Sequence, residues 1–211
     1  MSIEPFLTSI PFIVAGILFV LYPAVRPFSD EQTMDGARTF ASDRWVVAHS
    51  FALAGFILLG LGLLGLRDLL RGSVSERWAQ WGLVVGWFGV GLTLPYYGAE
   101  VFGLHAVGRE VIARNDVGLM SLVDSIRWGA GIWFILLGLV AIAVAALLFA
   151  VALWRAASYG RWGGVVLATA FALYIPQFAA SHPVRVLHGL LVFAGCWLIA
   201  RGVLRQASGM A

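Results

Sequence analysis

Residues 81–105 read WGLVVGWFGVGLTLPYYGAEVFGLH, a stretch apolar enough to cross a lipid bilayer that nevertheless contains an acid, Glu100. Steps of four and three place seven small or polar residues on one face of a helix. They are Gly82, Gly86, Gly89, Thr93, Tyr96, Glu100 and Gly103. Glycines let neighbouring membrane helices approach closely. Pro95 removes a helical hydrogen bond and predicts a bend. We therefore expect tight packing at one end of this helix and a cavity around Glu100 at the other.

The composition indicates a polytopic, all-α membrane protein. Of 211 residues, 61% are hydrophobic and 12% are charged, whereas soluble domains average about 45–50% and 25%. All 14 basic residues are arginine, which excludes a lysine Schiff base with retinal or pyridoxal phosphate. The net charge of +3 is dispersed, so we expect no nucleic-acid partner. The single cysteine, Cys196, lies in an apolar run and is interpreted as a core residue.

Six apolar segments predict a six-transmembrane-helix bundle that forms one domain over residues 1–211. Their ranges are 5–25, 45–66, 78–107, 128–154, 162–180 and 184–204. Tryptophans near the ends of several segments match the aromatic belt of membrane proteins. On one side of the predicted bundle, the arginines lie close to the helix ends with few acidic residues beside them. On the other side, acidic residues accompany the arginines. We therefore expect both termini in the cytoplasm, in a bacterial inner membrane, with residues 27–44 outside.

Polar residues near one end of the predicted helices suggest a shared site. If successive helices alternate in direction, they all fall at the non-cytoplasmic end: His49, Glu100, His105, Arg127, Tyr174, Gln177, His182 and His188. Small residues lie deeper on the same helix faces, and polar side chains avoid lipid, so these faces are expected to point into the bundle. His105 and His182 are interpreted as interfacial residues, because they lie next to loops.

The favoured function is a membrane-embedded enzyme that acts by acid–base chemistry on a hydrophobic, lipid-like or isoprenoid substrate, such as a cyclase or an isomerase. A carboxyl group in an apolar environment holds its proton more tightly and can donate it to a substrate. Glu100, His49 and His188 are the catalytic candidates. The expected substrate-binding residues are Tyr96, Tyr97, Arg127, Tyr174 and Gln177. The simpler alternative is that Glu100 only pairs with a structural arginine such as Arg127.

Two other functions remain open. His49 and His188 could ligate a b-type haem between helices, although no cofactor is firmly implied and the absence of HxxxH and HExxH patterns predicts no metal site. The polar residues could instead form a gate for protons or a small solute. Membrane lipids are the expected surroundings, and the sequence does not predict an oligomeric state.

Two segments, WVVAHSFALAGFILLGLGLLGL and YYGAEVFGLHAVGRE, resemble small polytopic membrane proteins of uncharacterised function from high-GC bacteria. The resemblance covers about the middle half of the chain and implies no activity. The chain is also similar, at the level of class only, to the small membrane-bound terpene cyclases, which are compact helical bundles that use intramembrane carboxylates. Those cyclases typically have seven spans and a pair of acids, whereas this chain offers six spans and one acid.

Overall fold

The computed structural model describes residues 5–158 and 160–208, and in these ranges it contains helices and no strand. This confirms the prediction of an all-α protein. The long helices are α1 (Pro5–Val25), α3 (Asp43–Leu69), α4 (Glu76–Gly98), α7 (Gly131–Arg155) and α9 (His182–Ala207). The shorter elements are α2 (Met34–Phe40), the π-helical turn η1 (Ala99–Gly103), α5 (Leu104–Arg114), the 3-10 turn η2 (Val117–Met120), α6 (Ser121–Trp128), α8 (Arg161–Ala172) and the 3-10 turn η3 (Pro176–Ala179).

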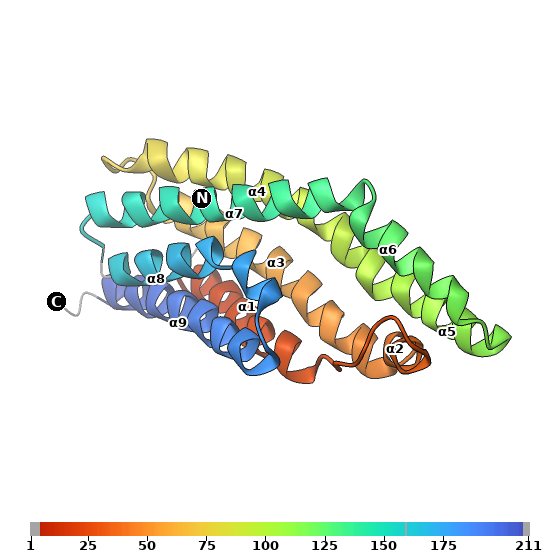
Figure 1. Ribbon diagram of the computed structural model, residues 1–211. Coiled ribbons are helices and arrows are strands. Elements are labelled where there is room, and N and C mark those ends of the chain that lie inside the picture. Colours follow the sequence, from red (N-terminus) through yellow and green to blue (C-terminus); the bar gives the residue numbers. More distant parts are fainter. Residues whose placement is uncertain (1–4, 159, 209–211) are drawn as a thin grey trace.

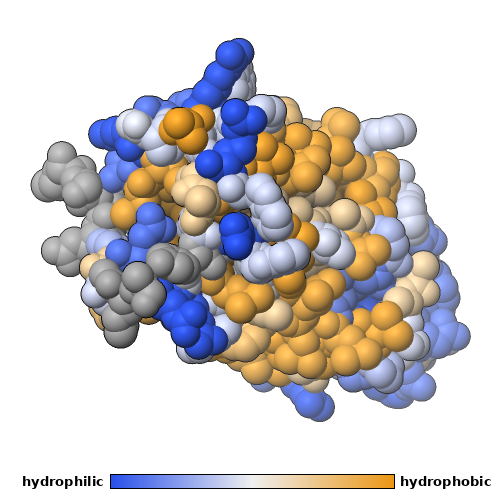
Figure 2. Space-filling model, turned by 90° about the vertical axis from the view of Figure 1, so that its left-hand side faces the viewer, coloured by the Kyte–Doolittle hydropathy of each residue, from blue (hydrophilic) through white to orange (hydrophobic). Residues whose placement is uncertain are grey.

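Four helices, α1, α3, α7 and α9, are long and apolar enough to cross a membrane. At most half of the most apolar stretch of each is buried inside the protein, so apolar side chains face outward. Figure 2 shows such residues covering a broad area of one face, with hydrophilic residues at its margins. A soluble protein rarely exposes so large an apolar surface. These features indicate a multi-pass membrane protein.

The other two predicted spans look different. The helix α4 has the length of a span, but its glycines, threonine and tyrosines lower its hydropathy. The helix α8 has only 12 residues and is about 18 Å long. The predicted span 162–180 therefore ends early, because a turn and the Pro176 of η3 follow α8.

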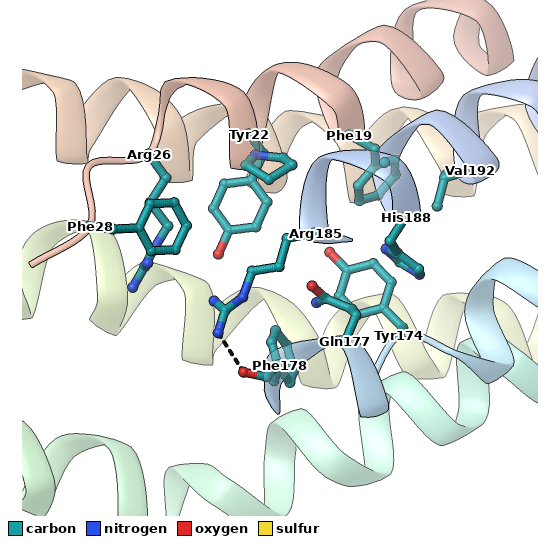
Figure 3. A pocket seen from close by; sticks show the side chains of 12 residues that line it. Phe19, Tyr22, Arg26, Phe28, Tyr174, Gln177, Phe178, Arg185, His188 and Val192 are labelled. Carbon is teal, nitrogen blue, oxygen red and sulfur yellow. Dashed lines mark hydrogen bonds between the residues drawn. The ribbon is translucent and has the colours of Figure 1, made fainter. Parts of the chain in front are cut away.

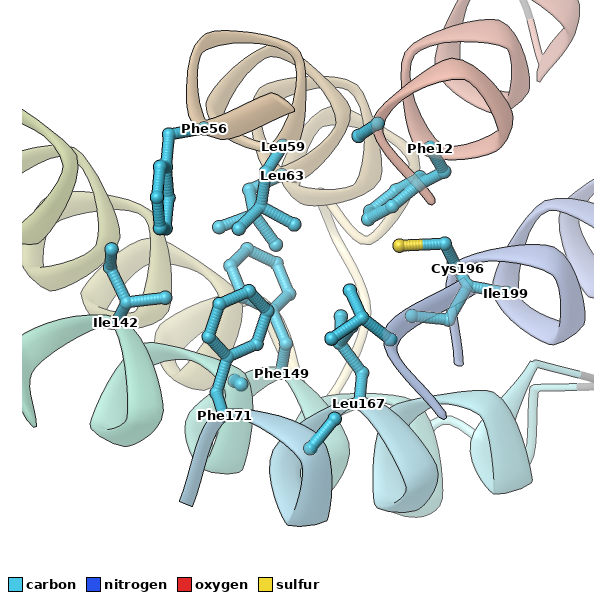
Figure 4. Packing of buried hydrophobic residues seen from close by; sticks show 14 of the residues in the cluster. Phe12, Phe56, Leu59, Leu63, Ile142, Phe149, Leu167, Phe171, Cys196 and Ile199 are labelled. Carbon is cyan, nitrogen blue, oxygen red and sulfur yellow. The ribbon is translucent and has the colours of Figure 1, made fainter. Parts of the chain in front are cut away.

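Six helices pack in a closed ring, in which each contacts the next: α1, α3, α4, α7, α8, α9 and again α1 (Figure 1). Apolar side chains from around the ring fill its centre. Figure 4 shows Phe12 of α1, Leu63 of α3 and Phe149 of α7 directed toward the side chains of α8 and α9. Cys196 belongs to this core and is fully buried.

Glycines bring α4 and α7 together, as the periodic face of α4 predicts. A Cβ atom on Gly89 would lie 2.8 Å from the carbonyl oxygen of Gly138 and 2.9 Å from the main-chain nitrogen of Ile142. On the opposite side of the contact, Gly138 lies against Thr93. The two backbones therefore touch at this point, which leaves no space for a side chain.

The fourth helix continues well beyond the ring. Its segments α4, η1 and α5 contain 23, 5 and 11 residues and together span about 58 Å, about twice the thickness of a bilayer core. In Figure 1, α5 leaves the bundle at an angle beside α6 and α2. These elements, with η2, form what we term the cap, which has its own small hydrophobic core. Its buried residues are Ala37, Phe40, Trp45, Leu104, Val111, Met120 and Val123. The helix thus continues to Arg114, seven residues beyond the predicted end of the span at residue 107.

Candidate functional site

Glu100 lies in the π-helical turn η1. Pro95 cannot donate a hydrogen bond, and shortly after it the helix widens, so that the N–H of Leu104 donates to the carbonyl oxygen of Ala99, five residues earlier. The indole Nε1 of Trp45 donates to the main-chain oxygen of Glu100 over 2.7 Å and joins the turn to α3. Glu100 is 7% exposed. Such π-turns within α-helices occur frequently at functional sites.

The carboxylate of Glu100 is held by Arg127. The guanidinium Nε lies 2.6 Å from Oε1 and Nη2 lies 3.0 Å from Oε2, which is the two-pronged geometry of a strong arginine–carboxylate pair. Arg127 also donates to Glu31, which in turn accepts from Arg26 over 2.7 Å. Burial raises the pKa of Glu31, but Arg127 and Arg26 lower it by more, so this pKa lies below its ordinary value. Two arginines and two carboxylates thus form a neutral network, in which Glu100 has the arginine partner considered as the alternative to catalysis.

His49 lies beside this network. Its Nδ1–H donates to the carbonyl oxygen of Trp45 over 2.9 Å, and its ring packs on the indole of Trp45 with centroids 4.0 Å apart. Assignment of the proton to Nδ1 follows from this bond, since a carbonyl only accepts. The other ring nitrogen, Nε2, lies 3.8 Å from Oε2 of Glu100. His49 therefore presents a basic nitrogen to a carboxylate at a site that is 1% exposed.

A pocket of about 570 Å³, which we term the carboxylate pocket, opens around Glu100. One side of it is charged and aromatic, and α7 supplies an apolar wall. The lining residues used below are Tyr22, Arg26, Phe28, Asp30, Glu31, His49, Tyr96, Tyr97, Glu100, Arg127, Ile132, Ile135, Leu136, Phe178 and Arg185. The volume lies within the range of about 300–1,000 Å³ that is usual for small-molecule sites.

A second, much smaller space adjoins it, which we term the tyrosine cavity (Figure 3). Its volume of about 20 Å³ is enough for a single water molecule. Tyr174, Gln177 and His188 line it. The hydroxyl groups of Tyr174 and Tyr97 share a hydrogen bond of 3.3 Å, and the Nε2–H of His188 donates to the carbonyl oxygen of Ala170 over 2.8 Å.

The candidate residues from the sequence therefore gather at one end of the ring, in two adjoining spaces. Glu100, His49, Tyr96, Tyr97 and Arg127 line the carboxylate pocket, whereas Tyr174, Gln177 and His188 line the tyrosine cavity. Five residues border both spaces: Tyr22, Arg26, Phe28, Phe178 and Arg185. The two remaining histidines bond to main-chain oxygens, His105 to Phe40 and His182 to Pro23.

Four charged residues of the pocket lining were not among the candidates from the sequence: Arg26, Asp30, Glu31 and Arg185. Arg185 lies three residues before His188, hence on the same helix face, and this spacing could have identified it. Arg26 and Glu31 reach the pocket through the turn after α1, and no helical periodicity places such residues.

A haem bound between His49 and His188 would require this arrangement to change. Tyr97 and Tyr174 lie in the chain of contacts between His49 and His188, so both tyrosines would have to move before one haem could lie between the two rings. Across residues 5–158 and 160–208, no group of three or more histidine, cysteine or acidic residues is arranged to hold a metal ion.

Comparisons with models of known protein families, with characterised proteins and with solved structures found no match to this chain. The function therefore has to be inferred from the chemistry of the carboxylate pocket itself.

Proposed function

We propose that this protein is a six-span protein of the bacterial cytoplasmic membrane that binds a lipid-like molecule in the carboxylate pocket and acts on it by acid–base chemistry. The observation that carries the proposal is one pocket of about 570 Å³ that joins a buried Glu100–Arg127–His49 cluster to an apolar wall. In this proposal α4 and α8 also cross the membrane, which brings the number of spans to six. Each of these two helices packs in the ring between helices that are long and apolar enough to cross the membrane.

The lining favours an amphipathic ligand. Ile132, Ile135 and Leu136 offer a hydrocarbon surface to a chain, and the residues of the charged network line the same pocket. Aromatic rings also line the pocket, and the rings of Tyr22 and Tyr97 pack with centroids 5.9 Å apart. Aromatic faces attract cations. An isoprenoid chain, whose isomerisation and cyclisation pass through cationic carbon, fits these surroundings.

In this proposal His49 and Glu100 divide the acid–base work. Nε2–H of protonated His49, whose positive charge the Glu100 carboxylate at 3.8 Å stabilises, gives its proton to a double-bond carbon of the substrate and forms the carbocation. After rearrangement or ring closure, loss of a proton from another carbon to Nε2 completes an isomerisation or a cyclisation without any other reactant. Arg127 donates to both oxygens of Glu100, so in this proposal the carboxylate serves as the charge partner of His49.

Ligand binding is tested with farnesol as the probe in detergent solution. Ile132→Trp fills the apolar wall of the pocket and should reduce the affinity for farnesol at least about tenfold. Leu137→Trp is the matched control, because Leu137 lies on the same helix, is 57% exposed and is not part of the pocket lining. Farnesol binding that is equally strong in both folded variants would refute the proposed site.

The chemistry is tested by deuterium exchange. Proton transfer to carbon in ²H₂O labels the isoprenoid, which mass spectrometry detects. Glu100→Gln should abolish labelling, but it also removes one of the two carboxylates that Arg127 contacts and so should lower the stability. The double variant Glu100→Gln with Arg127→Gln should recover part of that stability and remain inactive. Labelling at the wild-type rate in this stable double variant would show that Glu100 has no chemical role.

A further inference from the structure

Arg185, in the first turns of α9, is oriented by two main-chain oxygens. Its Nε–H donates to the carbonyl oxygen of Ala180 over 3.0 Å, and its Nη2 donates to that of Phe178. An arginine has five N–H groups, so these bonds leave three for other partners. Figure 3 shows the guanidinium extending from α9 between Tyr22 and Phe28 on one side and Tyr174 and Gln177 on the other.

Arg185 differs from the other arginines of the pocket in its lack of a carboxylate partner. Arg26 and Arg127 form ion pairs with Glu31 and Glu100, and no ion pair among the described residues includes Arg185. The remaining acid of the lining, Asp30, lies on the exposed turn after α1 and accepts from the main-chain nitrogen of Gln32. Arg185 therefore carries the one positive charge of the pocket that is not balanced by direct contact.

A second guanidinium lies nearby. The Cζ atoms of Arg26 and Arg185 lie 4.5 Å and 5.5 Å from the centroid of the same ring, that of Phe28. Arg26 has only Glu31 as a partner, and Glu31 is shared with Arg127. Like charges this close repel one another, and an anion within reach of both guanidinium groups would remove that repulsion. Guanidinium groups bind phosphate and carboxylate in a planar, two-pronged geometry.

We infer that Arg185 binds the anionic headgroup of the substrate, a phosphate or a carboxylate, while the hydrocarbon chain lies against Ile132 and Leu136 on α7. This inference rests on the proposed function, because it assigns the chemical class of the molecule held in the carboxylate pocket. Arg185 acts as a substrate-binding and specificity-determining residue that lines the same pocket as the Glu100–Arg127 pair. The preferred ligand is thus an anionic amphiphile and not a neutral lipid alcohol.

The test compares three probes: farnesyl phosphate, farnesol and inorganic phosphate. Their affinities are measured by calorimetry on the full-length protein in dodecyl maltoside. Farnesyl phosphate should bind at least about tenfold more tightly than either of the other two, since hydrogen bonds to a charged group contribute about 1.5–3 kcal/mol. In Arg185→Gln, the affinity for farnesyl phosphate should fall to that for farnesol, and the affinity for farnesol should not change. Arg109→Gln removes the same charge from an exposed position on α5 and should leave all three affinities unchanged.

The outcomes separate this inference from the proposed function. If farnesyl phosphate and farnesol bind equally well, and Arg185→Gln affects neither, the lipid pocket stands and the headgroup role of Arg185 is refuted. Inorganic phosphate that binds as tightly as farnesyl phosphate would also overturn the inference, because the site would then be one for a free anion. Failure of both isoprenoid probes to bind would remove the proposed function itself. Equal melting temperatures of wild type and Arg185→Gln show that a loss of binding does not come from unfolding. If Arg185→Gln does not fold, Arg185→Lys takes its place. An unchanged preference of Arg185→Lys for farnesyl phosphate over farnesol would then refute the two-pronged recognition of the headgroup by a guanidinium group.

Discussion

Replacement of Gly89 by alanine tests the contact on which the position of the site depends. The added Cβ atom would lie 2.8 Å from the carbonyl oxygen of Gly138 and 2.9 Å from the nitrogen of Ile142, whereas ordinary contacts begin at 3.4 Å. Both neighbours are backbone atoms, which cannot rotate away as a side chain can. The helices α4 and α7 would have to separate by roughly half an ångström, and overpacking of this kind costs about 1–3 kcal/mol.

Gly91→Ala is the matched control, since Gly91 lies two residues further along the same helix and nothing lies within 4 Å of a Cβ atom built there. That change gains up to about 1 kcal/mol from the higher helix propensity of alanine. Because both variants share that propensity gain, they should differ by the packing cost alone, about 1–3 kcal/mol, or about 2 °C or more in melting temperature. Thermal unfolding in dodecyl maltoside, followed by circular dichroism, measures the difference. Equal melting temperatures would refute the conclusion that the backbones of α4 and α7 meet at Gly89.

Two further predictions concern pH and topology. The pKa of Glu31 is lower in the folded protein than its ordinary value of 4.5, so its contribution to stability is present above pH 4.5 and is lost as the pH falls through the folded pKa. The difference in melting temperature between wild type and Glu31→Gln should therefore shrink below about pH 4.5. A constant difference down to pH 3 would contradict this. With both termini in the cytoplasm, a membrane-impermeant maleimide should label Ser29→Cys but not Ser208→Cys in intact cells, because Ser29 and Ser208 are exposed and the native Cys196 is buried. The opposite labelling pattern would reverse the orientation.

Periodicity in the sequence predicted much of the helix packing. Gly82, Gly86 and Gly89 face neighbouring helices, as expected from their spacing of four and three. The same reasoning fails for Phe134: a helical period continued from Arg127 predicts that Phe134 faces inward, but it is 45% exposed. The reason is physical, since the chain breaks between α6 and α7, and a helical period cannot be continued across Gly129 and Ala130.

The cap could have been recognised only in part. Leu104, Gly108 and Val111 are buried in α5 at spacings of four and three, which is a readable amphipathic pattern. The charged residues between them indicate the end of a membrane span, and a loop is therefore expected there. Charged residues do not end a helix, and α5 continues through them. The sequence allows the pairing of Glu100 with Arg127, but the link to Glu31 lies beyond such reasoning, because it depends on the path of the turn after α1.

The π-turn gives a single residue unusual influence over the cap. One extra residue in a helical turn rotates everything beyond it by about 100° relative to a regular α-helix. The face of α5 that meets α2 is therefore rotated about the helix axis, relative to the face of α4 that meets α7, by the amount that one inserted residue adds. Gly108 lies so close to α2 that a Cβ atom there would be 2.6 Å from the carbonyl oxygen of Ala37. Deletion of one residue from η1 would rotate Gly108 away from α2 and detach the cap. Evolution of the protein is therefore expected to conserve the length of this turn more strictly than its composition.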